Sequence, residues 1–436
     1  NFIGGEFVGS GKTFENFTPV DGTLLSYVHE ATKEMVDEAV IAARKAYKEV
    51  WGKMPVEQRC KILYAVADGI DARSDEFIEA ETMDTGKPRS LASHVDIPRG
   101  AANFRVFADL IKSVGTEAYQ QDTPDGKGAI NYSVRHPHGV VGVISPWNLP
   151  LLLSTWKIAP AMATGNAVIL KPSEETPTTA TLLAEVMKEA GMPDGAFSVV
   201  HGFGPGSAGE FMTTHRGIDA ITFTGETTTG GAIMRAASDD IKALSFELGG
   251  KNPSIVFADA DFDAAIEGTV RSVFANCGQV CLCSERVYVE RPIFDKFVAT
   301  LKGHAENMKL GRPEDADTQM GPLISHEHRD KVKGYYDLAK ELGATVVTGG
   351  GIPEFGDERD NGAYIEPTIF TGLNEDSRIQ KEEIFGPVCH ITPFDTEEEA
   401  LSMANDTEYG LASTVWTTNL ARAHRVAQGM ESGINW

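Results

Sequence analysis

Three of the chain's five cysteines lie close together in the stretch FANCGQVCLCSERV, residues 274–287. Thiols at this spacing could bind zinc, form a redox disulfide, pack in a core, or supply one nucleophilic thiolate. Zinc sites need Cys or His pairs at short spacing, and the sequence offers no second cluster and no nearby His. A C-x-x-C redox motif is also lacking. Cys281 follows a Gly-Gln-Val break after a predicted helix, so it is the candidate nucleophile, whereas Cys277 and Cys283 are expected to pack in the interior.

A nucleophilic thiol needs a base and an oxyanion donor, and two other motifs offer them. The turn ISPWNLP, residues 144–150, presents Asn148, whose amide could donate to a developing oxyanion; an Asn that bonds its own turn is the alternative. In FELGGKNP, residues 246–253, Glu247 precedes two glycines between apolar segments. We expect this carboxylate to be partly desolvated, with a raised pKa that suits a general base, although a surface Glu is the commoner case.

The stretch FTGETTTGG, residues 223–231, predicts a strand-to-helix turn that could approach a phosphate. Gly225 and Gly230 would let the backbone pass close to a ligand, and the N-terminus of the following helix favours an anion. Many strand-helix turns contain two glycines without such a function. Glu226 stands where a phosphate would prefer a hydroxyl, which argues against tight contact with a pyrophosphate.

A second candidate for nucleotide binding is ILKPSEETP, residues 169–177, which follows a predicted strand. Doubly wound sheets bind ligands at the carboxyl ends of their strands, where Lys171 and Glu174 are expected. A carboxylate there could accept both hydroxyls of an adenosine ribose and repel a 2′-phosphate, which favours NAD over NADP. The alternative is a helix start, with Ser173 as N-cap and two glutamates in the first turn.

The elements that must position these residues alternate between strand-like and helical patterns, which predicts an α/β fold with a doubly wound parallel sheet followed by a second α/β unit. The polar, turn-rich stretch 113–139 predicts a protruding hairpin. The predicted strands begin at residues 140, 167, 197, 219 and 253, and the predicted helices cover residues 35–51, 178–190, 207–214, a segment up to 237, and 263–275.

Composition narrows the class of protein. A chain of 436 residues suggests two or three domains, and its net charge of −24 disfavours nucleic acid and anionic membranes as partners. No apolar run approaches the roughly 18 residues of a membrane span, so no membrane partner is expected. Five cysteines without framework spacing favour the cytoplasm. The missing initiator Met and the strand-like ending GINW suggest that the natural chain extends further, at the C-terminal end in particular.

Taken together and in order, PWN, KPSE, FTGETTTG, ELGGKNP, FANCGQVC and KEEIFGPV (381–388) resemble the aldehyde dehydrogenase superfamily across essentially the whole chain. The resemblance implies that Cys281 is the nucleophile and that Glu247 is the general base for the deacylating water. It implies an oxyanion hole made of Asn148 and the backbone N–H of Cys281. It also implies NAD as cofactor and no metal. The residues that match NAD-binding positions are Ile144, Pro146, Trp147, Lys171, Glu174, Gly204, Gly225, Glu226, Gly230, Leu248, Glu383 and Phe385.

The same resemblance implies how the domains are organised. An NAD-binding domain is expected in residues 1–114 and 137–248, a β arm for oligomerisation in residues 115–136, and a catalytic α/β domain in residues 249–436. Because the arm pairs between subunits in this superfamily, a homodimer or homotetramer is expected.

Within the superfamily, the segments around Asn148, Cys281 and IPRGAANFRVFA look most similar to the muconic semialdehyde branch. The resemblance implies a small semialdehyde substrate with a distal carboxylate, bound by Arg99 with Asn148 and Trp156 also in the substrate site. The expected reaction is oxidation of 2-aminomuconate 6-semialdehyde to 2-aminomuconate, in the breakdown of aromatic or tryptophan-derived carbon. The 2-hydroxy analogue is the alternative, ahead of a broader specificity. The alternative for Arg99 is a residue without a substrate-binding role, exposed on a helix and paired with an acid such as Asp96.

Two hypotheses from other classes remain at this point. A thiol esterase or amidase would use Cys281 without a redox step. A non-catalytic protein would keep the fold but need not keep Cys281, Glu247 and Asn148 together, and all three are present.

Overall fold

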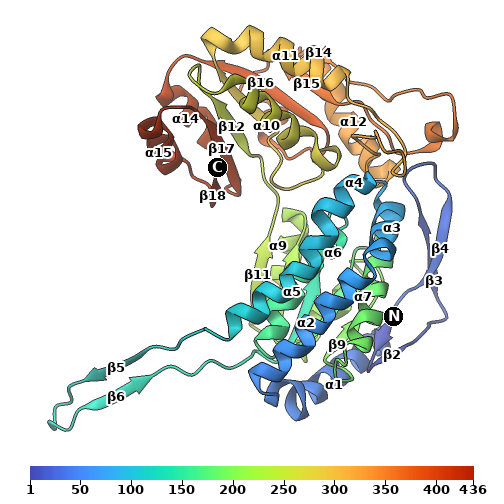
Figure 1. Ribbon diagram of the computed structural model, residues 1–436, viewed down its shortest axis with the longest axis vertical. Helices are drawn as coiled ribbons and strands as arrows, with labels where there is room; N and C mark the ends of the chain where they lie inside the picture. The colour runs from blue at the N-terminus through green and yellow to red at the C-terminus, as the bar shows by residue number, and fades with distance from the viewer.

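The computed structural model describes residues 1–436 as two seven-stranded sheets and two separate hairpins. The first sheet has the order β11-β10-β7-β8-β9-β1-β2, and the second has the order β14-β15-β16-β13-β12-β17-β18. In Figure 1 the blue and green N-terminal part, with the first sheet, occupies the lower half, and the yellow to red C-terminal part lies above it. The predicted α/β fold with doubly wound parallel sheets is confirmed.

The first sheet is parallel from β11 to β9, and β1 joins β9 in antiparallel orientation. Its strands are β1 (Phe2–Ile3), β2 (Glu6–Phe7), β7 (Val140–Ile144), β8 (Ala167–Lys171), β9 (Phe197–Val199), β10 (Ala220–Thr224) and β11 (Ala243–Glu247). The helices of this half are α1 (Lys33–Glu49), η1 (Trp51–Lys53), α2 (Val56–Ala72), α3 (Ser74–Thr85), α4 (Arg89–Leu91), the π-helical η2 (Ala92–Asp96), α5 (Ile97–Ile111), α6 (Pro150–Ala163), α7 (Thr178–Glu189), α8 (Ala208–Thr214) and α9 (Thr227–Ser238).

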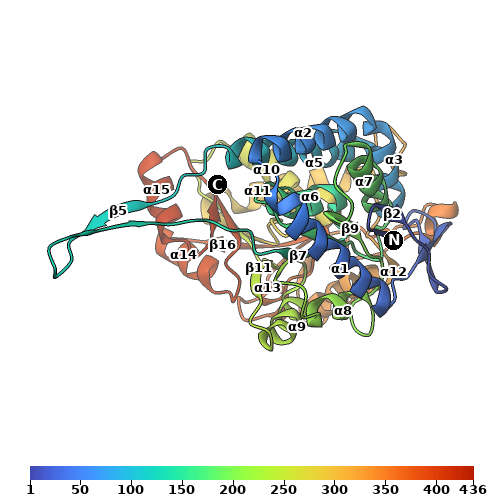
Figure 2. The ribbon, with the colours of Figure 1, turned by 90° about the horizontal axis from the view of Figure 1, so that it is seen from below.

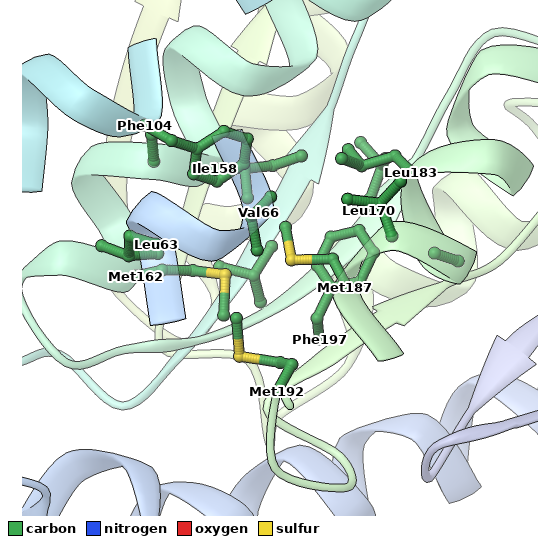
Figure 3. Packing of buried hydrophobic residues seen from close by; sticks show 14 of the residues in the cluster. Leu63, Val66, Phe104, Ile158, Met162, Leu170, Leu183, Met187, Met192 and Phe197 are labelled. Atoms are coloured by element: carbon green, nitrogen blue, oxygen red, sulfur yellow. The ribbon is translucent and has the colours of Figure 1, made fainter. Parts of the chain in front are cut away.

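Alternate residues of the central strands enter two separate cores, one on each face of the sheet. Val141 and Val143 of β7 pack with α2, α5, α6 and α7 in a cluster of 34 buried residues. Their neighbours Val140 and Ile144 pack with α1, α8 and α9 in a cluster of 18 buried residues. Figure 3 shows part of the larger cluster, to which helices contribute residues such as Leu63, Phe104 and Ile158 and strands contribute Leu170 and Phe197. A strand buried on both faces needs an uninterrupted apolar run, so VVGVI and AVIL can be recognised as buried strands from the sequence.

The second sheet forms the other half of the molecule, with a β14–β15 antiparallel pair at one edge and parallel pairing elsewhere. Its strands are β12 (Pro253–Val256), β13 (Arg286–Glu290), β14 (Thr345–Thr348), β15 (Thr368–Thr371), β16 (Val388–Phe394), β17 (Ala412–Trp416) and β18 (Ile434–Asn435). Its helices are α10 (Phe262–Phe274), η3 (Ala275–Gly278), η4 (Arg291–Ile293), α11 (Phe294–Glu306), α12 (His326–Glu341), η5 (Glu358–Asn361), α13 (Arg378–Lys381), α14 (Glu397–Asn405) and α15 (Leu420–Gly429).

The predicted hairpin is present and projects far from the body, as Figures 1 and 2 both show. It consists of β5 (Ala118–Gln121) and β6 (Ala129–Tyr132), which pair only with each other. The hairpin β3 (Thr13–Phe17) and β4 (Leu24–His29) near the N-terminus lies outside what the sequence predicted. No helix in residues 1–436 has the length and apolar character needed to cross a bilayer.

Candidate active site

The nucleophile loop, residues 275–283, begins where α10 ends, and its backbone turns sharply before Cys281. Asn276 (φ 51°) and Cys277 (φ 58°) adopt left-handed conformations, followed by Gly278 at φ 71°. A Cβ at Gly278 would lie 1.9 Å from the Gly386 carbonyl oxygen, so no other residue fits there. The turn leaves Cys281 partly exposed and buries Cys277 and Cys283, as predicted for the two packing cysteines.

Asn252 fixes the loop from the side of the second sheet. Its Nδ2 donates to the carbonyl oxygen of Cys281 at 2.7 Å and to that of Cys283 at 2.8 Å. Burial raises the pKa of Cys281 to about 12, and the nearby carboxylates of Glu383 and Glu247 add to this effect. The thiol is therefore neutral at physiological pH until a base or a positive charge acts on it.

Asn148 is buried against the nucleophile loop and is bonded to it at two points. Its side-chain Nδ2 donates to the Gln279 carbonyl oxygen at 2.8 Å. Its backbone carbonyl oxygen accepts from Asn276 Nδ2 at 3.0 Å. An amide nitrogen carries two hydrogens, so one remains for another acceptor. These bonds lie between residues more than 120 positions apart and bring Asn148 beside the segment that carries Cys281. The alternative of an Asn that serves its own turn is wrong.

Glu247 is the last residue of β11, and its side chain is exposed. The predicted desolvation of this carboxylate is therefore wrong, because the Gly-rich turn that follows packs into the protein without covering it. The carboxylate still acts on its surroundings, since it contributes to the raised pKa of Cys281 and opposes the lowered pKa of Lys157.

Lys157 is a site residue that the sequence reasoning missed. It is a buried cation on α6, its Nζ donates to Thr222 Oγ1 at 3.1 Å, and burial lowers its pKa to about 8. The signal was available, because Lys157 is the only charged residue in the otherwise apolar helix PLLLSTWKIAPAMA.

The carboxyl ends of four parallel strands form one edge of the first sheet. Ile144 pairs in register with Lys171 on one side and with Phe223 on the other, and Thr224 pairs with Glu247. This edge therefore carries the predicted cofactor residues of β7 and β8, and Gly204 follows β9 at the same edge.

Lys171 is buried at this edge, and its Nζ donates to the Pro172 carbonyl oxygen at 2.7 Å and lies 3.5 Å from Glu174 Oε2. Glu174 is half-exposed and precedes α7, which begins only at Thr178 with Pro177 as N-cap. The alternative of Ser173 as N-cap is therefore wrong: its Oγ accepts from the Glu175 N–H within a local turn.

The N-terminus of α9 faces the same edge and has an unusual cap. Glu226 is the N-cap residue but makes no capping hydrogen bond, so the first N–H groups of the helix keep no side-chain partner. Its carboxylate lies 3.8 Å from Lys331 Nζ of α12, on the other half of the molecule. A Cβ at Gly230 would lie 2.8 Å from a methyl group of Leu248, so glycine there allows α9 to pack closely against that residue.

The two halves meet through aromatic rings and backbone amides. Trp147, after Pro146 in the turn that carries Asn148, packs edge-on against Phe385 with ring centroids 5.4 Å apart. Phe385 has φ 62°, and its carbonyl oxygen accepts from His328 Nε2 at 2.7 Å. Glu383 accepts from the Gly250 N–H at 2.9 Å, and burial raises the pKa of its carboxyl to about 7.

Of the predicted substrate residues, Arg99 and Trp156 lie on the adjacent helices α5 and α6, and Asn148 lies in the turn before α6. Arg99 is exposed in the first turn of α5 and makes no ion pair, so the interpretation that it pairs with Asp96 is wrong. Trp156 lies on α6, which packs along α5, and its ring is 5.5 Å from that of Phe107. Beside the nucleophile, a cavity of about 490 Å³ is lined by residues that include Val280, Leu282 and Arg271.

Comparison with known proteins places this site in a family. A sequence model described as the aldehyde dehydrogenase family matches residues 7–436. The chain belongs to the aldehyde dehydrogenase family. A 2-hydroxymuconic semialdehyde dehydrogenase of Pseudomonas sp. strain CF600 is 63% identical over 438 residues, which cover 100% of this chain and 90% of that protein. A 2-aminomuconic 6-semialdehyde dehydrogenase of Pseudomonas sp. is 57% identical over 100% of this chain and 89% of that protein.

Solved structures agree with this assignment to the aldehyde dehydrogenase family. The NAD⁺ complex of an aldehyde dehydrogenase from Bacillus cereus superposes with a TM-score of 0.95 at 41% identity, over 100% of this chain and 87% of that one. The fold predicted from the ordered motifs is therefore the fold of this family, and the chain is an oxidoreductase that acts on the aldehyde group.

Proposed function

We propose that this aldehyde dehydrogenase oxidises 2-aminomuconate 6-semialdehyde to 2-aminomuconate with NAD⁺, through a thioester on Cys281. The observation that carries the chemistry is the double attachment of Asn148 to the nucleophile loop, at the Gln279 carbonyl oxygen and Asn276 Nδ2. It holds an amide donor beside a partly exposed thiol, which is what acyl chemistry at a cysteine requires.

The residues at the edge of the first sheet fit NAD. The first N–H groups of α9 have no side-chain cap, and Thr224 Oγ1 at the end of β10 is buried without a partner. Lys171 and Glu174 lie where a ribose would meet the sheet edge, and the carboxylate of Glu174 disfavours a 2′-phosphate. On the other half of the molecule, Glu383 acts on the pKa of Cys281, and the nearby Phe385 packs against Trp147. When bound, NAD⁺ accepts the hydride that leaves the aldehyde carbon.

In the first half-reaction, Cys281 loses its proton and its sulfur attacks the aldehyde carbon. Because Cys281 is partly exposed, its proton passes to solvent water. The remaining amide hydrogen of Asn148 and the backbone N–H of Cys281 then stabilise the oxyanion of the tetrahedral adduct. Hydride loss converts this adduct into a thioester on Cys281.

In the second half-reaction, Glu247 deprotonates a water molecule that attacks the thioester. Its exposure suits this role, because the water must reach the site from solvent and the proton must leave again. Lys157 is a buried cation near this carboxylate; burial lowers its pKa to about 8, and the charge of Glu247 opposes that lowering. The acid product leaves, and the thiol is restored.

The substrate assignment rests on the names of the most similar relatives and on Arg99. Two relatives at 63% and 57% identity are named for 2-hydroxymuconic and 2-aminomuconic semialdehydes. Such substrates carry a carboxylate opposite the aldehyde. Arg99 is a cation without an internal partner on a helix next to the one that carries Trp156, so it is free to bind that carboxylate.

Oxidation of 2-hydroxymuconate 6-semialdehyde is the second candidate, and a specific observation favours it. The relative named for the 2-hydroxy substrate shares 63% identity with this chain, against 57% for the one named for the 2-amino substrate. An amino and an enol group of similar size make the two substrates difficult to separate by shape alone.

The arm supports assembly with further copies of the chain. Tyr119, Ile130 and Tyr132 of β5 and β6 are each more than 60% exposed, and both strands have an unpaired edge. Exposed apolar strands of this kind need a partner in water. We propose that they pair with a second copy to form a homodimer or homotetramer. Five free cysteines, four of them buried, suit a reducing cytoplasm.

The proposal is tested by following NADH absorbance with the amino and hydroxy semialdehydes and with a simple aliphatic aldehyde. In Arg99→Ala, kcat/KM should fall for both semialdehydes by about 1.5–3 kcal/mol, which is roughly 10- to 150-fold, and stay unchanged for the simple aldehyde. Arg105→Ala is the matched control, since Arg105 lies on the same helix but pairs with Asp68 and Asp71.

Equal losses in Arg99→Ala on all three aldehydes would mean that Arg99 is structural, and a higher kcat/KM for the hydroxy substrate would select the second candidate. Product formation without NAD⁺ reduction would instead indicate a thiol hydrolase.

A further inference from the structure

A fully buried cluster of charged side chains lies directly behind the turn that carries Asn148. Lys87 Nζ lies 2.5 Å from Asp96 Oδ2 and 3.2 Å from Glu81 Oε1, and the three side chains are at most 1% exposed. Lys87 follows α3 in the segment DTGKP, Glu81 belongs to α3, and Asp96 ends the π-helical η2. None of the three touches the reacting groups.

The cluster bonds the backbone of the oxyanion donor itself and that of the third residue after it. Lys87 Nζ donates at 2.9 Å to the carbonyl oxygen of Asn148, and Glu81 Oε2 accepts at 3.2 Å from the N–H of Leu151. The helix α6 begins at Pro150 with no side-chain cap, so Glu81 supplies the acceptor that an N-cap residue would normally provide. The backbone of Asn148 is thus held from behind while its side chain faces the nucleophile loop.

The same cluster also holds the start of the helix that carries Arg99. Asp96 is the residue from which α5 begins, and Arg99 is in the first turn of that helix. A π-helical segment shifts the register of the residues that follow, and such segments are frequent at functional sites. One buried ammonium group therefore connects, through two bonds, the oxyanion donor and the helix turn that carries the proposed carboxylate-binding residue.

Stability alone does not explain this arrangement. Replacing a buried ion pair by apolar residues of similar volume is often neutral or stabilising, because desolvation of the charges offsets their attraction. Burial raises the pKa of Glu81 to about 8. For Lys87, burial lowers the pKa, but the two carboxylates outweigh it and keep the ammonium charged. The charged ammonium group of Lys87, fixed by its two acidic partners, can instead hold the backbone of Asn148 in a defined position.

We propose that Lys87 is a positioning residue that sets the spacing between Asn148 and Arg99, and so matches the site to the distance between the aldehyde and the carboxylate of the substrate. This inference rests on the proposed function, since it assumes the roles of Asn148 and Arg99. It adds that the length of the buried Lys87 side chain determines the distance between Asn148 and Arg99.

The test uses two variants of the full-length enzyme, neither of which removes one partner of the buried ion pairs while leaving the others charged. Lys87→Arg keeps the charge but changes the reach, and the triple variant Lys87→Met, Glu81→Gln, Asp96→Asn removes the charges without leaving one unpaired. Arg59→Lys is the matched control, because Arg59 is a buried cation whose guanidinium bonds the Ala163 carbonyl oxygen at the other end of α6.

In both Lys87 variants, kcat for the muconic semialdehyde should fall at least about tenfold, since a displacement of about 1 Å can cost up to about a hundredfold. The loss in kcat/KM should be larger for the semialdehyde than for a simple aldehyde, because only the semialdehyde must fit both ends. The Kd for NAD⁺ should not change, and Arg59→Lys should leave kcat within about twofold.

The decisive comparison repeats Lys87→Arg in an Asn148→Ala background. If Lys87 acts through Asn148, most of its effect on kcat disappears there, whereas a general structural defect would lower kcat by the same factor in both backgrounds. Equal factors, or a loss below twofold in both Lys87 variants, would overturn the inference. If Asn148→Ala itself leaves kcat unchanged, the proposed oxyanion role is wrong, and the two failures are thereby distinguished.

Discussion

The neutral state of the Cys281 thiol leads to a prediction about its reactivity with pH. Burial raises the pKa of Cys281 to about 12, with Glu383 and then Glu247 as the next causes. An ordinary cysteine has a pKa of about 8.5. In the enzyme without cofactor, the thiolate population should therefore rise tenfold for each pH unit between pH 7 and 10, without a plateau.

The expected magnitude follows from two opposing effects. At pH 8 the thiolate fraction is about 10⁻⁴ for a pKa of about 12 and about 0.2 for an ordinary cysteine, a difference of roughly 2,000-fold. A thiolate of higher pKa is more nucleophilic, with a Brønsted coefficient of about 0.4–0.5. Over the pKa difference of about 3.5 units, this raises the rate constant of the thiolate by roughly 25- to 55-fold. Cys281 should thus react with a small disulfide reagent roughly 40- to 100-fold more slowly than a free thiol at pH 8.

The assay measures the second-order rate with a chromogenic disulfide at each pH, and Cys281→Ser identifies the signal against the four buried cysteines. Glu383→Gln and Glu247→Gln each remove a carboxylate that raises the pKa, so both should accelerate the reaction at pH 8, Glu383→Gln more strongly. A plateau at or below pH 9, or no acceleration in either variant, would refute the reasoning that burial and these carboxylates keep the thiol neutral.

Three further predictions follow from the geometry of the site and the arm. Asn148→Ala should lower kcat about 10²- to 10³-fold with little change in KM, since it removes one oxyanion donor; an unchanged kcat in steady-state kinetics would contradict this. Glu226→Ser should tighten NAD⁺ binding about two- to fivefold in a fluorescence titration, because a charge worth about 0.3–1 kcal/mol leaves a helix N-terminus; weaker binding would count against the proposed phosphate site. Replacing residues 116–134 by a short Gly-Ser linker should reduce the molar mass found by light scattering to that of a smaller assembly; an unchanged mass would exclude the arm as the main interface.

The sequence predicts an element correctly where its local residue pattern agrees with its environment in the folded protein. The runs VVGVI and AVIL are buried on both faces of the sheet and become β7 and β8 with boundaries that differ by at most one residue from the prediction. The short strands of residues 1–29 were not predicted, since the exposed β2 and β4 show no apolar run and pair only with the neighbouring short strands β1 and β3. Residues 56–85 form two helices, α2 and α3, because the chain leaves the helical conformation at Arg73.

The site was only partly predictable for the same reason. Motifs predict Cys281 and Asn148 as site residues, but solvent exposure at the end of β11 depends on the assembled fold, and the prediction of a desolvated Glu247 failed there. The bond from Asn148 to Gln279 joins residues 131 positions apart, and the one from Lys87 to Asn148 joins residues 61 positions apart. Such pairs have no local signature, so the contacts of Gln279 and Lys87 with Asn148 became visible only in three dimensions.

The most direct test of the proposed chemistry is a rapid-mixing experiment on Glu247→Gln with the muconic semialdehyde and NAD⁺. Acylation should form about one NADH per active site, and steady turnover should then be slower than in the wild type by about 10²- to 10⁴-fold, since the base for hydrolysis is missing. Mass spectrometry of the quenched protein should find the acyl group on the peptide that contains Cys281. A variant that turns over at the wild-type rate, or that carries the acyl group on another residue, would contradict the account.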